Sequence, residues 1–443
     1  MLSTRDNEAI TRVGPGTPMG ALMRQYWLPA MLSSELPNVD SDPVRVMLLG
    51  EKLIAFRDTH GTVGLIQNHC PHRGASLFFG RNEEAGLRCV YHGWKFAADG
   101  TCIDMPNEPA ESDFKSKVKA VAYPTQERGG VVWAYLGPRE TPPPLPDLEA
   151  NNVEAEKARV IAVQRNCNWL QALEGDIDTS HLGFLHFGHA TPDTAPVGTL
   201  HHYALKDRAP RYAVVDEDYG TMYGAYRPAE PGQLYWRIAL FLFPFYAMIP
   251  TGVLGHQVIA RAWVPMDDEH TLFFNMALPG RSAGGAPASG AGRWPFSGSE
   301  QLPRSTDWFG RFRLVSRWEN DFRIDRDVQR RKDDYTGIAG IHTQDQAVTE
   351  SMGGIYDRTQ ERLGTSDAMV IRTRKRLIDA AKALRDKGTV PPGVDEPHVY
   401  QQRSGGVVLP KGVDWVEATK ELRKAGVSHP QLSRSVLGGM PAV

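Results

Sequence analysis

Four residues early in the chain have the side chains and the spacing of a metal–sulfur site. Cys70 and His72 form a C-x-H pair, and Cys89 and His92 form a C-x-x-H pair after sixteen intervening residues. Each pair is short enough to occupy the tip of one loop, so two loops together offer two thiolates and two imidazoles. Such a set can bind a structural zinc ion, or a [2Fe–2S] cluster in which two histidines replace two cysteines on one iron.

The distribution of the ligands favours the iron–sulfur cluster. Zinc sites usually take both cysteines from one C-x2-C loop and both histidines from a helix. Here each loop carries one cysteine and one histidine, so a loop can direct its thiolate to one iron and its imidazole to the other. The spacing therefore predicts a Rieske cluster. Cys102 and Cys167 lie outside the motif and are expected to be ordinary buried residues.

A second group of residues has the character of a mononuclear iron site. On an unbroken α-helix the spacing of His181 and His186 would separate the side chains by about 140°, but Gly183 between them allows the backbone to bend. Two imidazoles and one carboxylate form the facial triad of non-haem Fe(II) oxygenases, which leaves positions for O2 and substrate. The spacing leaves the carboxylate open among several downstream acids: Asp321, Asp325, Asp333, Asp345 and Asp357.

The residues around both groups resemble a known family. The segments Cys70-Pro71-His72-Arg73-Gly74, Cys89 to Trp94, Asp178-x2-His181-x4-His186 and Gln344 to Val348 are similar to those of Rieske non-haem iron ring-hydroxylating oxygenases, of the phthalate dioxygenase type. The resemblance implies an α+β fold: a β-rich Rieske [2Fe–2S] domain, and a catalytic domain with an antiparallel sheet covered by helices in a helix-grip (START-like) arrangement.

The resemblance also implies which residues hold the two iron centres. Cys70 and Cys89 would bind one iron of the cluster, and His72 and His92 the other. His181, His186 and Asp345 would bind the mononuclear Fe(II). Asp178 would bridge His181 to the cluster ligand His92 of a neighbouring subunit, since a carboxylate can accept N–H bonds from two imidazoles.

By the same resemblance, the chain is a terminal oxygenase that uses O2 to oxygenate a small aromatic substrate. Its partners would be a separate NADH-dependent flavin and iron–sulfur reductase or a ferredoxin, and copies of itself in a homotrimer or stacked trimers. The product would be a hydroxylated arene or cis-diol. The alternative is a monooxygenase that dealkylates an aryl ether or an N-alkyl anilide, because substrate pose decides between these outcomes.

One arginine is a candidate for substrate binding. The resemblance places Arg237 in the strand where phthalate-type enzymes bind a substrate carboxylate, for which a guanidinium is well suited. A structural ion pair is an equal alternative. A second arginine of the family has no clear counterpart near residues 200–206. Several aromatic residues either pack in the core or line the pocket: Phe184, Phe187, Phe241, Phe243, Phe245 and Tyr246.

The sequence pattern gives the order of the elements. We expect a helical segment at 1–26, the Rieske domain at 27–148 and the catalytic domain at 149–443. Prolines at 142–146 mark the exit from the first domain. A helix is predicted at 168–177, strands at 211–280, a flexible loop at 281–299, and a long helix from an N-cap at Ser366 to Gly388.

Composition limits the other function classes. The 443 residues carry 50 basic and 52 acidic side chains, a near balance that argues against nucleic-acid or membrane-surface binding. No apolar run is long enough for a membrane span, the N-terminus lacks the apolar core of a signal peptide, and four cysteines do not form a disulfide framework, so a cytoplasmic location is expected. A pure Rieske electron carrier would not need the second histidine pair.

Overall fold

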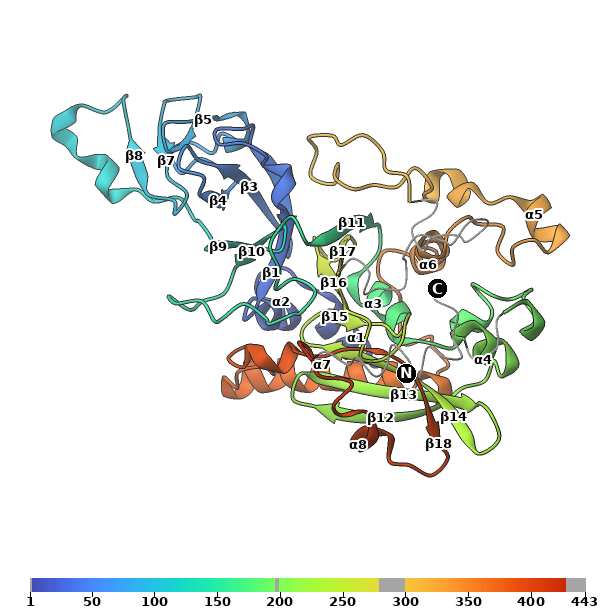
Figure 1. Cartoon of the computed structure of the whole chain (residues 1–443). Helices are drawn as coiled ribbons and strands as arrows, with labels where there is room; N and C mark the ends of the chain where they lie inside the picture. Colours follow the sequence, from blue (N-terminus) through green and yellow to red (C-terminus); the bar gives the residue numbers. More distant parts are fainter. Residues whose placement is uncertain (1, 196–198, 279–298, 428–443) are drawn as a thin grey trace.

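The computed structural model describes residues 2–195, 199–278 and 299–427. A β-rich N-terminal half and a larger second half with a broad sheet and most of the helices lie side by side (Figure 1). No helix among the described residues is both long and apolar enough to span a bilayer.

The N-terminal half consists of three small antiparallel sheets. They are β1 (Trp27–Leu32), β10 (Val131–Tyr135) and β9 (Thr125–Arg128); β2 (Val44–Leu48), β3 (Glu51–Arg57) and β4 (Val63–Gln67); and β5 (Arg81–Glu83), β6 (Gly86–Arg88), β7 (Lys95–Phe96) and β8 (Cys102–Asp104). The turn between β2 and β3 has φ of 47° at Leu49 and 77° at Gly50. Positive φ at both turn residues is what a two-residue type I′ hairpin requires.

The second half is built on one eight-stranded antiparallel sheet. Its strand order is β11 (Arg159–Arg165), β17 (Thr271–Ala277), β16 (Ile259–Pro265), β15 (Tyr246–Met248), β14 (Gln233–Leu242), β13 (Gly220–Pro228) and β12 (Arg211–Glu217), with β18 (Gly405–Pro410) also paired to β14. The chain runs through β12, β13 and β14 as consecutive hairpin partners.

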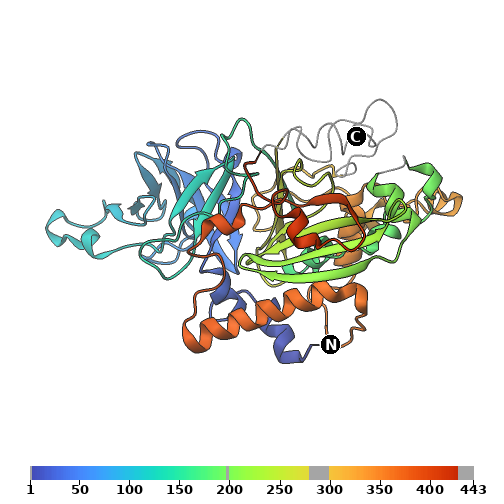
Figure 2. The same cartoon turned by 60° about the horizontal axis from the view of Figure 1, so that its bottom comes forward.

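Helices pack on this sheet. α3 (Trp169–Ile177) lies against β14, β15 and β16, and α7 (Ala368–Lys387) lies against β12 and β13. The N-terminal helices α1 (Thr4–Thr11) and α2 (Pro18–Met23) pack against α7, as Figure 2 shows. The other helices are α4 (Leu200–Lys206), α5 (Arg326–Arg331), α6 (Ile341–Glu350) and α8 (Trp415–Thr419).

The predicted fold class is confirmed: a β-rich domain accompanies a domain with an antiparallel sheet and helices. The exact domain limits at 26 and 148 stay predictions. The predicted loop at 281–299 lies outside the described residues apart from Ser299.

One predicted helix boundary is wrong. Asp367, and not Ser366, is the N-cap of α7. The Asp367 carboxylate accepts a hydrogen bond of 2.7 Å from the Gly364 backbone N–H, which closes a 3-10 turn over Thr365–Asp367 ahead of the helix. Gly388 ends α7 with φ of 64°, as predicted.

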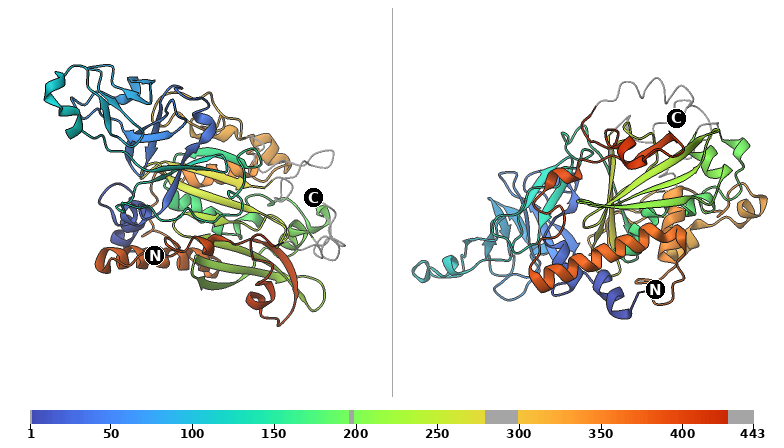
Figure 3. Two further views of the ribbon diagram at one scale, coloured as in Figure 1. Left: turned by 60° about the vertical axis from the view of Figure 1, so that its left-hand side comes forward. Right: turned by 90° about the horizontal axis from the view of Figure 1, so that it is seen from below.

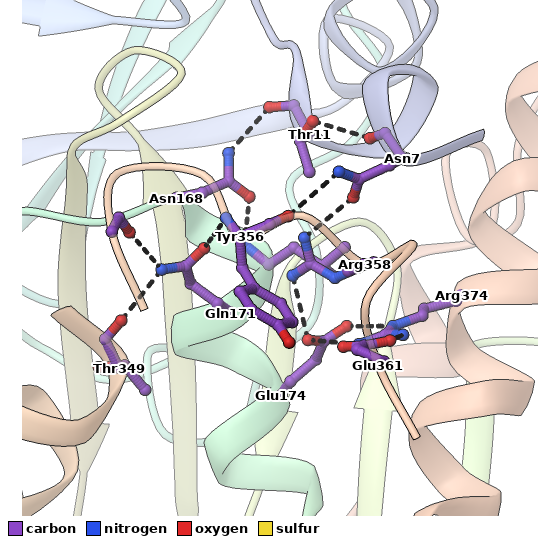
Figure 4. Close-up of polar contacts among 12 residues, drawn as sticks. Asn7, Thr11, Asn168, Gln171, Glu174, Thr349, Tyr356, Arg358, Glu361 and Arg374 are labelled. Atoms are coloured by element: carbon purple, nitrogen blue, oxygen red, sulfur yellow. Dashed lines mark hydrogen bonds and ion pairs between the residues drawn. The ribbon is translucent and has the colours of Figure 1, made fainter. Parts of the chain in front are cut away.

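A buried polar network ties α3 to α7 and to the N-terminal helix (Figure 4). Glu174 Oε2 lies 3.1 Å from Arg358 Nη2, and Glu174 Oε1 lies 2.6 Å from Arg374 Nε. Arg374 also binds Glu361, and Arg358 donates to Asn7 on α1. Burial alone would raise the pKa of Glu174, but the charges of the two arginines outweigh it and lower the pKa, so the carboxylate is ionised.

Replacing Glu174 with glutamine should destabilise the catalytic domain strongly. It leaves Arg374 with Glu361 as its carboxylate partner and Arg358 with none among the described residues, at a cost of about 3–5 kcal/mol. The matched control is Asp379→Asn, which breaks the exposed pair with Lys375 and should cost at most about 1 kcal/mol. The urea midpoint of the catalytic-domain transition measures both, and equal midpoints for the two variants would contradict the expected cost of breaking the network.

Candidate functional site

Two loops of the same design carry the predicted cluster ligands. In the first, Cys70 N–H donates to the carbonyl of Ala75, and Gly74 N–H donates back to the Cys70 carbonyl, each at 2.8–2.9 Å. In the second, Cys89 and Gly93 make the same two bonds at 2.8 and 2.9 Å. Both glycines have positive φ, 75° and 82°, which side chains rarely adopt. Each loop is thus a tight turn that directs one cysteine and one histidine toward the other loop.

The side chains on these loops fit a [2Fe–2S] cluster. Cys70 and Cys89 are both buried and carry free thiols. The rings of His72 and His92 lie 4.4 Å apart between centroids. The Nδ1 atom of each ring is buried and has no hydrogen-bond partner among the described residues. Since buried imidazole nitrogens are normally paired, these two atoms are available as metal ligands.

The surroundings of the loops support the same use. Burial, with a contribution from the neighbouring Cys89, raises the pKa of the Cys70 thiol to about 11. A metal that binds there must therefore displace protons. The ring of Trp94 stacks nearly parallel on the His72 ring, with 4.4 Å between centroids. The indole N–H of Trp94 donates to Asn107 at 2.7 Å, so the tryptophan is held in place against one face of the His72 ring.

The mononuclear site forms where α3 ends. Asn168 caps the start of α3 by accepting from Leu170 N–H, and the helix stops at Ile177. A 3-10 turn over His181–Gly183 follows and breaks the helical spacing, as Gly183 predicted. The rings of His181 and His186 consequently lie 5.1 Å apart between centroids.

Asp345 reaches this pair from α6. Its Oδ1 lies 3.2 Å from His186 Nε2 and 3.6 Å from His181 Nε2. The three ligand atoms are all within 4.8 Å of one another, and they are the one set of three this close together among the described residues. Burial alone would raise the pKa of Asp345, but the hydrogen bond and charge of His186 and the charges of His181 and Arg165 lower it. Two imidazoles and one ionised carboxylate on one side match a facial triad.

The other acids left open by the sequence have different roles. Asp325 caps α5 through the backbone N–H groups of Asp327 and Val328. Asp357 accepts from Thr359 in an exposed turn. Neither belongs to the group formed by the two histidines, nor do Asp321 and Asp333.

Asp178 lies behind His181. Its Oδ2 is 3.2 Å from His181 Nδ1, and its Oδ1 accepts from the Ser180 N–H and hydroxyl, both at 2.7 Å. Burial raises its pKa, but the hydrogen bond and charge of His181 outweigh this and lower it. Among the described residues it makes no hydrogen bond to His72 or His92, and the strands β5–β8 lie at the end of the molecule away from α6 (Figures 1 and 3).

Arg237 is buried on β14 opposite Ala225 of β13, and its Nε and Nη1 have no hydrogen-bond partner among the described residues. It forms no salt bridge there either, so the structural ion pair considered from the sequence is not found. Tyr223 lies on the same face of β13. Burial raises the pKa of Tyr223, the charge of Arg237 lowers it and the charge of Asp178 raises it, so both charged groups lie near this tyrosine. The guanidinium therefore lies on the side of the sheet that faces the mononuclear site.

A second buried arginine shares this face. Arg227 donates from Nε to the Asp207 carbonyl at 2.7 Å, and its Nη1 is unpartnered. Burial, and then the positive charge of Arg237, lower its pKa to about 10. Sequence reasoning missed Arg227, although its place on the strand paired with that of Arg237 was a usable signal.

Most of the aromatic candidates are core residues. Four of them are fully buried in the main hydrophobic core: Phe241, Phe243, Phe245 and Tyr246. Phe184 is exposed, and Arg208 lies over its ring at 5.4 Å.

Cys102 and Cys167 are buried free thiols, as expected.

Comparisons with known proteins place the chain in a family. Residues 26–122 match the family model described as Rieske [2Fe-2S] domain, and residues 134–435 match that described as LigXa C-terminal domain like. The chain belongs to the Rieske non-haem iron oxygenases. It is 48% identical over 430 residues, 95% of this chain and 98% of the relative, to the 3-chlorobenzoate-3,4-dioxygenase oxygenase subunit of Comamonas testosteroni.

Another relative and a solved structure agree with this placement. The phthalate 4,5-dioxygenase oxygenase subunit of Pseudomonas putida is 37% identical over 94% of each chain. The structure of NdmA from Pseudomonas putida CBB5 has the same fold, with a TM-score of 0.52 and 16% identity over 90% of this chain and all of that chain.

This Rieske oxygenase is thus a terminal oxygenase component with a [2Fe–2S] cluster and a mononuclear iron. Both curated relatives are named as oxygenase subunits, that is, as one component of an enzyme system with more than one subunit. The alternatives of a pure electron carrier and of a zinc-binding protein do not account for the second matched domain.

Asp345→Asn should remove the mononuclear iron and leave the cluster intact. Total iron should fall from about three to about two atoms per subunit, while the visible absorption of the cluster persists. Metal analysis and acid-labile sulfide measure the two contents. Asp357→Asn is the matched control and should keep all the iron; full iron retention by Asp345→Asn would refute the assignment.

Proposed function

We propose that this enzyme dihydroxylates an aromatic carboxylate of the benzoate class. The observation that carries the proposal is the buried guanidinium of Arg237, which has no partner in the described part of the chain and lies on the face toward the mononuclear site. A buried charge without a partner is costly, and a carboxylate ligand would compensate it with paired hydrogen bonds. The names of three relatives support this class: 3-chlorobenzoate, phthalate and phenoxybenzoate dioxygenases.

We assign the ligands as the sequence predicts them. Cys70, His72, Cys89 and His92 would hold the cluster, and His181, His186 and Asp345 the mononuclear iron. When bound, the two centres supply stored electrons and O2 activation. The overall reaction consumes the arene, O2, two electrons and two protons, and both oxygen atoms enter the cis-diol.

The residues of the chain determine where the substrate reacts. Arg237 holds the carboxylate, so the ring lies between the sheet and the mononuclear site. Arg227 adds positive charge to the same face, which favours an anion over a neutral analogue. Asp178 accepts from His181 Nδ1–H and thereby leaves His181 Nε2 as the ligand atom.

We further propose that electrons cross between subunits of a homotrimer. Asp178 is paired to His181 on one side and keeps a quarter of its side chain exposed. It has no bond to a cluster histidine of its own chain, so His92 of a neighbouring subunit is the expected partner. A cyclic arrangement would give each mononuclear site one such cluster. Four free cysteines and dependence on an NADH-linked donor support a cytoplasmic location.

Dealkylation is the second candidate. The 5,5'-dehydrodivanillate O-demethylase oxygenase subunit of Sphingobium is 31% identical over 93% of this chain and 86% of the relative. The same ligand set serves both reactions, and the pose of the substrate selects between them.

Arg237→Met should lower kcat/KM for benzoate-class anions on the order of 10²-fold, because it removes one partner of a desolvated charge pair. The uncharged benzamide should be affected little. Arg211→Met, at an exposed arginine of the neighbouring strand β12, is the matched control.

With 18-O2 the product should carry two labelled oxygens in a cis-diol; one labelled oxygen with loss of an alkyl group would instead support dealkylation.

Mixed oligomers test the path between subunits. Cys70→Ser subunits should lack the cluster, Asp345→Asn subunits should lack the mononuclear iron, and each alone should be inactive. If each cluster serves the next subunit, doubly tagged mixed trimers should regain turnover at about one site in three. Verified mixed trimers without turnover would contradict the inter-subunit route.

A further inference from the structure

The second histidine of the mononuclear site has a partner that the sequence did not reveal. His186 Nδ1 lies 2.7 Å from Oε1 of Gln344, the residue directly before Asp345 on α6. The Gln344 side chain is buried, with 3% of the residue exposed. One turn of α6 thus supplies both the carboxylate that faces His186 Nε2 and the amide that faces its Nδ1.

The orientation of this amide is fixed from behind. Gln344 Nε2 lies 2.9 Å from the Ile338 carbonyl and 3.3 Å from both carboxylate oxygens of Asp334. These groups only accept hydrogen bonds, so the NH2 end of the amide must face them. The carbonyl end must therefore face His186, which can only donate to it from a protonated Nδ1. A neutral imidazole protonated at Nδ1 has its lone pair on Nε2, toward Asp345.

The loop that presents Asp334 is itself ordered by that carboxylate. Asp334 Oδ1 accepts from the backbone N–H of Thr336 at 3.0 Å and of Gly337 at 3.1 Å. Gly337 has φ of 71°, and a Cβ there would lie 2.4 Å from the Asp325 carbonyl. In this turn Asp334 and the Ile338 carbonyl converge on the amide.

The two iron histidines consequently have different partners. His181 is held by the carboxylate of Asp178, which is half-buried, whereas His186 is held by a neutral amide inside the protein. We propose that Gln344, held by Asp334, is a positioning residue that fixes the Nδ1–H tautomer and the ring orientation of His186 for iron binding. The proposal rests on the assignment of His186 and Asp345 as ligands in the proposed function.

The test is iron affinity in a matched pair of variants of the full-length protein. Gln344→Leu keeps the approximate volume but removes the acceptor. Gln346→Leu is the control, because Gln346 is equally buried on α6 and bonds to Glu350 but to neither iron histidine. The mononuclear iron is removed with a chelator, and Fe(II) is titrated back. The absorption and EPR spectra of the Rieske cluster report in each sample that the protein is folded.

Gln344→Leu should weaken Fe(II) binding on the order of 10- to 100-fold, the usual cost of losing a residue that orients a metal ligand. The EPR signal of the nitric oxide adduct of the ferrous site should also change its rhombicity, since the ring of His186 is freed to rotate. Gln346→Leu should keep wild-type affinity and signal. Unchanged affinity and an unchanged nitric oxide signal in Gln344→Leu would overturn the proposal.

A second variant covers the case in which Gln344→Leu fails to fold. Asp334→Asn, in the half-buried loop, permits the Gln344 amide to rotate and should weaken Fe(II) binding several-fold, less than Gln344→Leu. Wild-type affinity in folded Asp334→Asn would overturn the role given to Asp334, because the Ile338 carbonyl alone would then hold the amide. Failure of the ligand assignment is distinguishable: in that case the wild-type protein itself would take up no Fe(II) at this site, or His186→Ala would retain it.

Discussion

The mononuclear site depends on the docking of α3 against α6. The two histidines follow α3, and the carboxylate comes from α6, far along the chain. A buried amide joins the two helices: Gln171 Nε2 donates to the carbonyls of Thr349 at 3.0 Å and Gly353 at 2.8 Å, and its Oε1 accepts from Tyr356 N–H at 3.0 Å (Figure 4). All three of these hydrogen bonds join Gln171 to the end of α6 and the segment after it. A shift of one helix along the other would leave several buried polar groups unpaired, which costs more than the bonds themselves contribute.

The charged network around Glu174 extends this constraint to the rest of the domain. The Glu174 carboxylate binds Arg358 and also Arg374 of α7, and Arg358 in turn donates a hydrogen bond to Asn7 of α1 (Figure 4). Buried ion pairs add little net stability compared with apolar packing, but they are expensive to break and so admit few alternative arrangements. The network therefore specifies the position of α3, one turn ahead of Asp178, more than it stabilises the fold.

The sequence was sufficient for the parts of the site that are local in the chain. The predicted cluster ligands lie on two short loops, and the predicted iron ligands His181 and His186 span one turn, so residue type and spacing alone were enough to propose their chemistry. Spacing could not select Asp345 from the other acids, because that choice is made by the packing of α6 against α3. The strand of Arg237 was predictable, but whether a described side chain pairs with it depends on the residues of the neighbouring strands. Gln344 belongs to the same sequence segment as Asp345. Its contact with His186 in the folded structure, which the sequence does not show, is what distinguishes it from Gln346.

The different partners of His181 and His186, the proposed iron ligands, follow from where each lies. Asp178 keeps part of its carboxylate exposed at the end of α3, and an ionised group there remains solvated and available to a second imidazole. The His186 side is closed by α6 and the Asp334 loop, where a carboxylate in direct contact with the ring would place a second negative charge beside that of Asp345 in a buried site. An amide orients the ring without adding charge. The more exposed histidine, His181, thus has the charged partner, and the buried histidine, His186, has the neutral one.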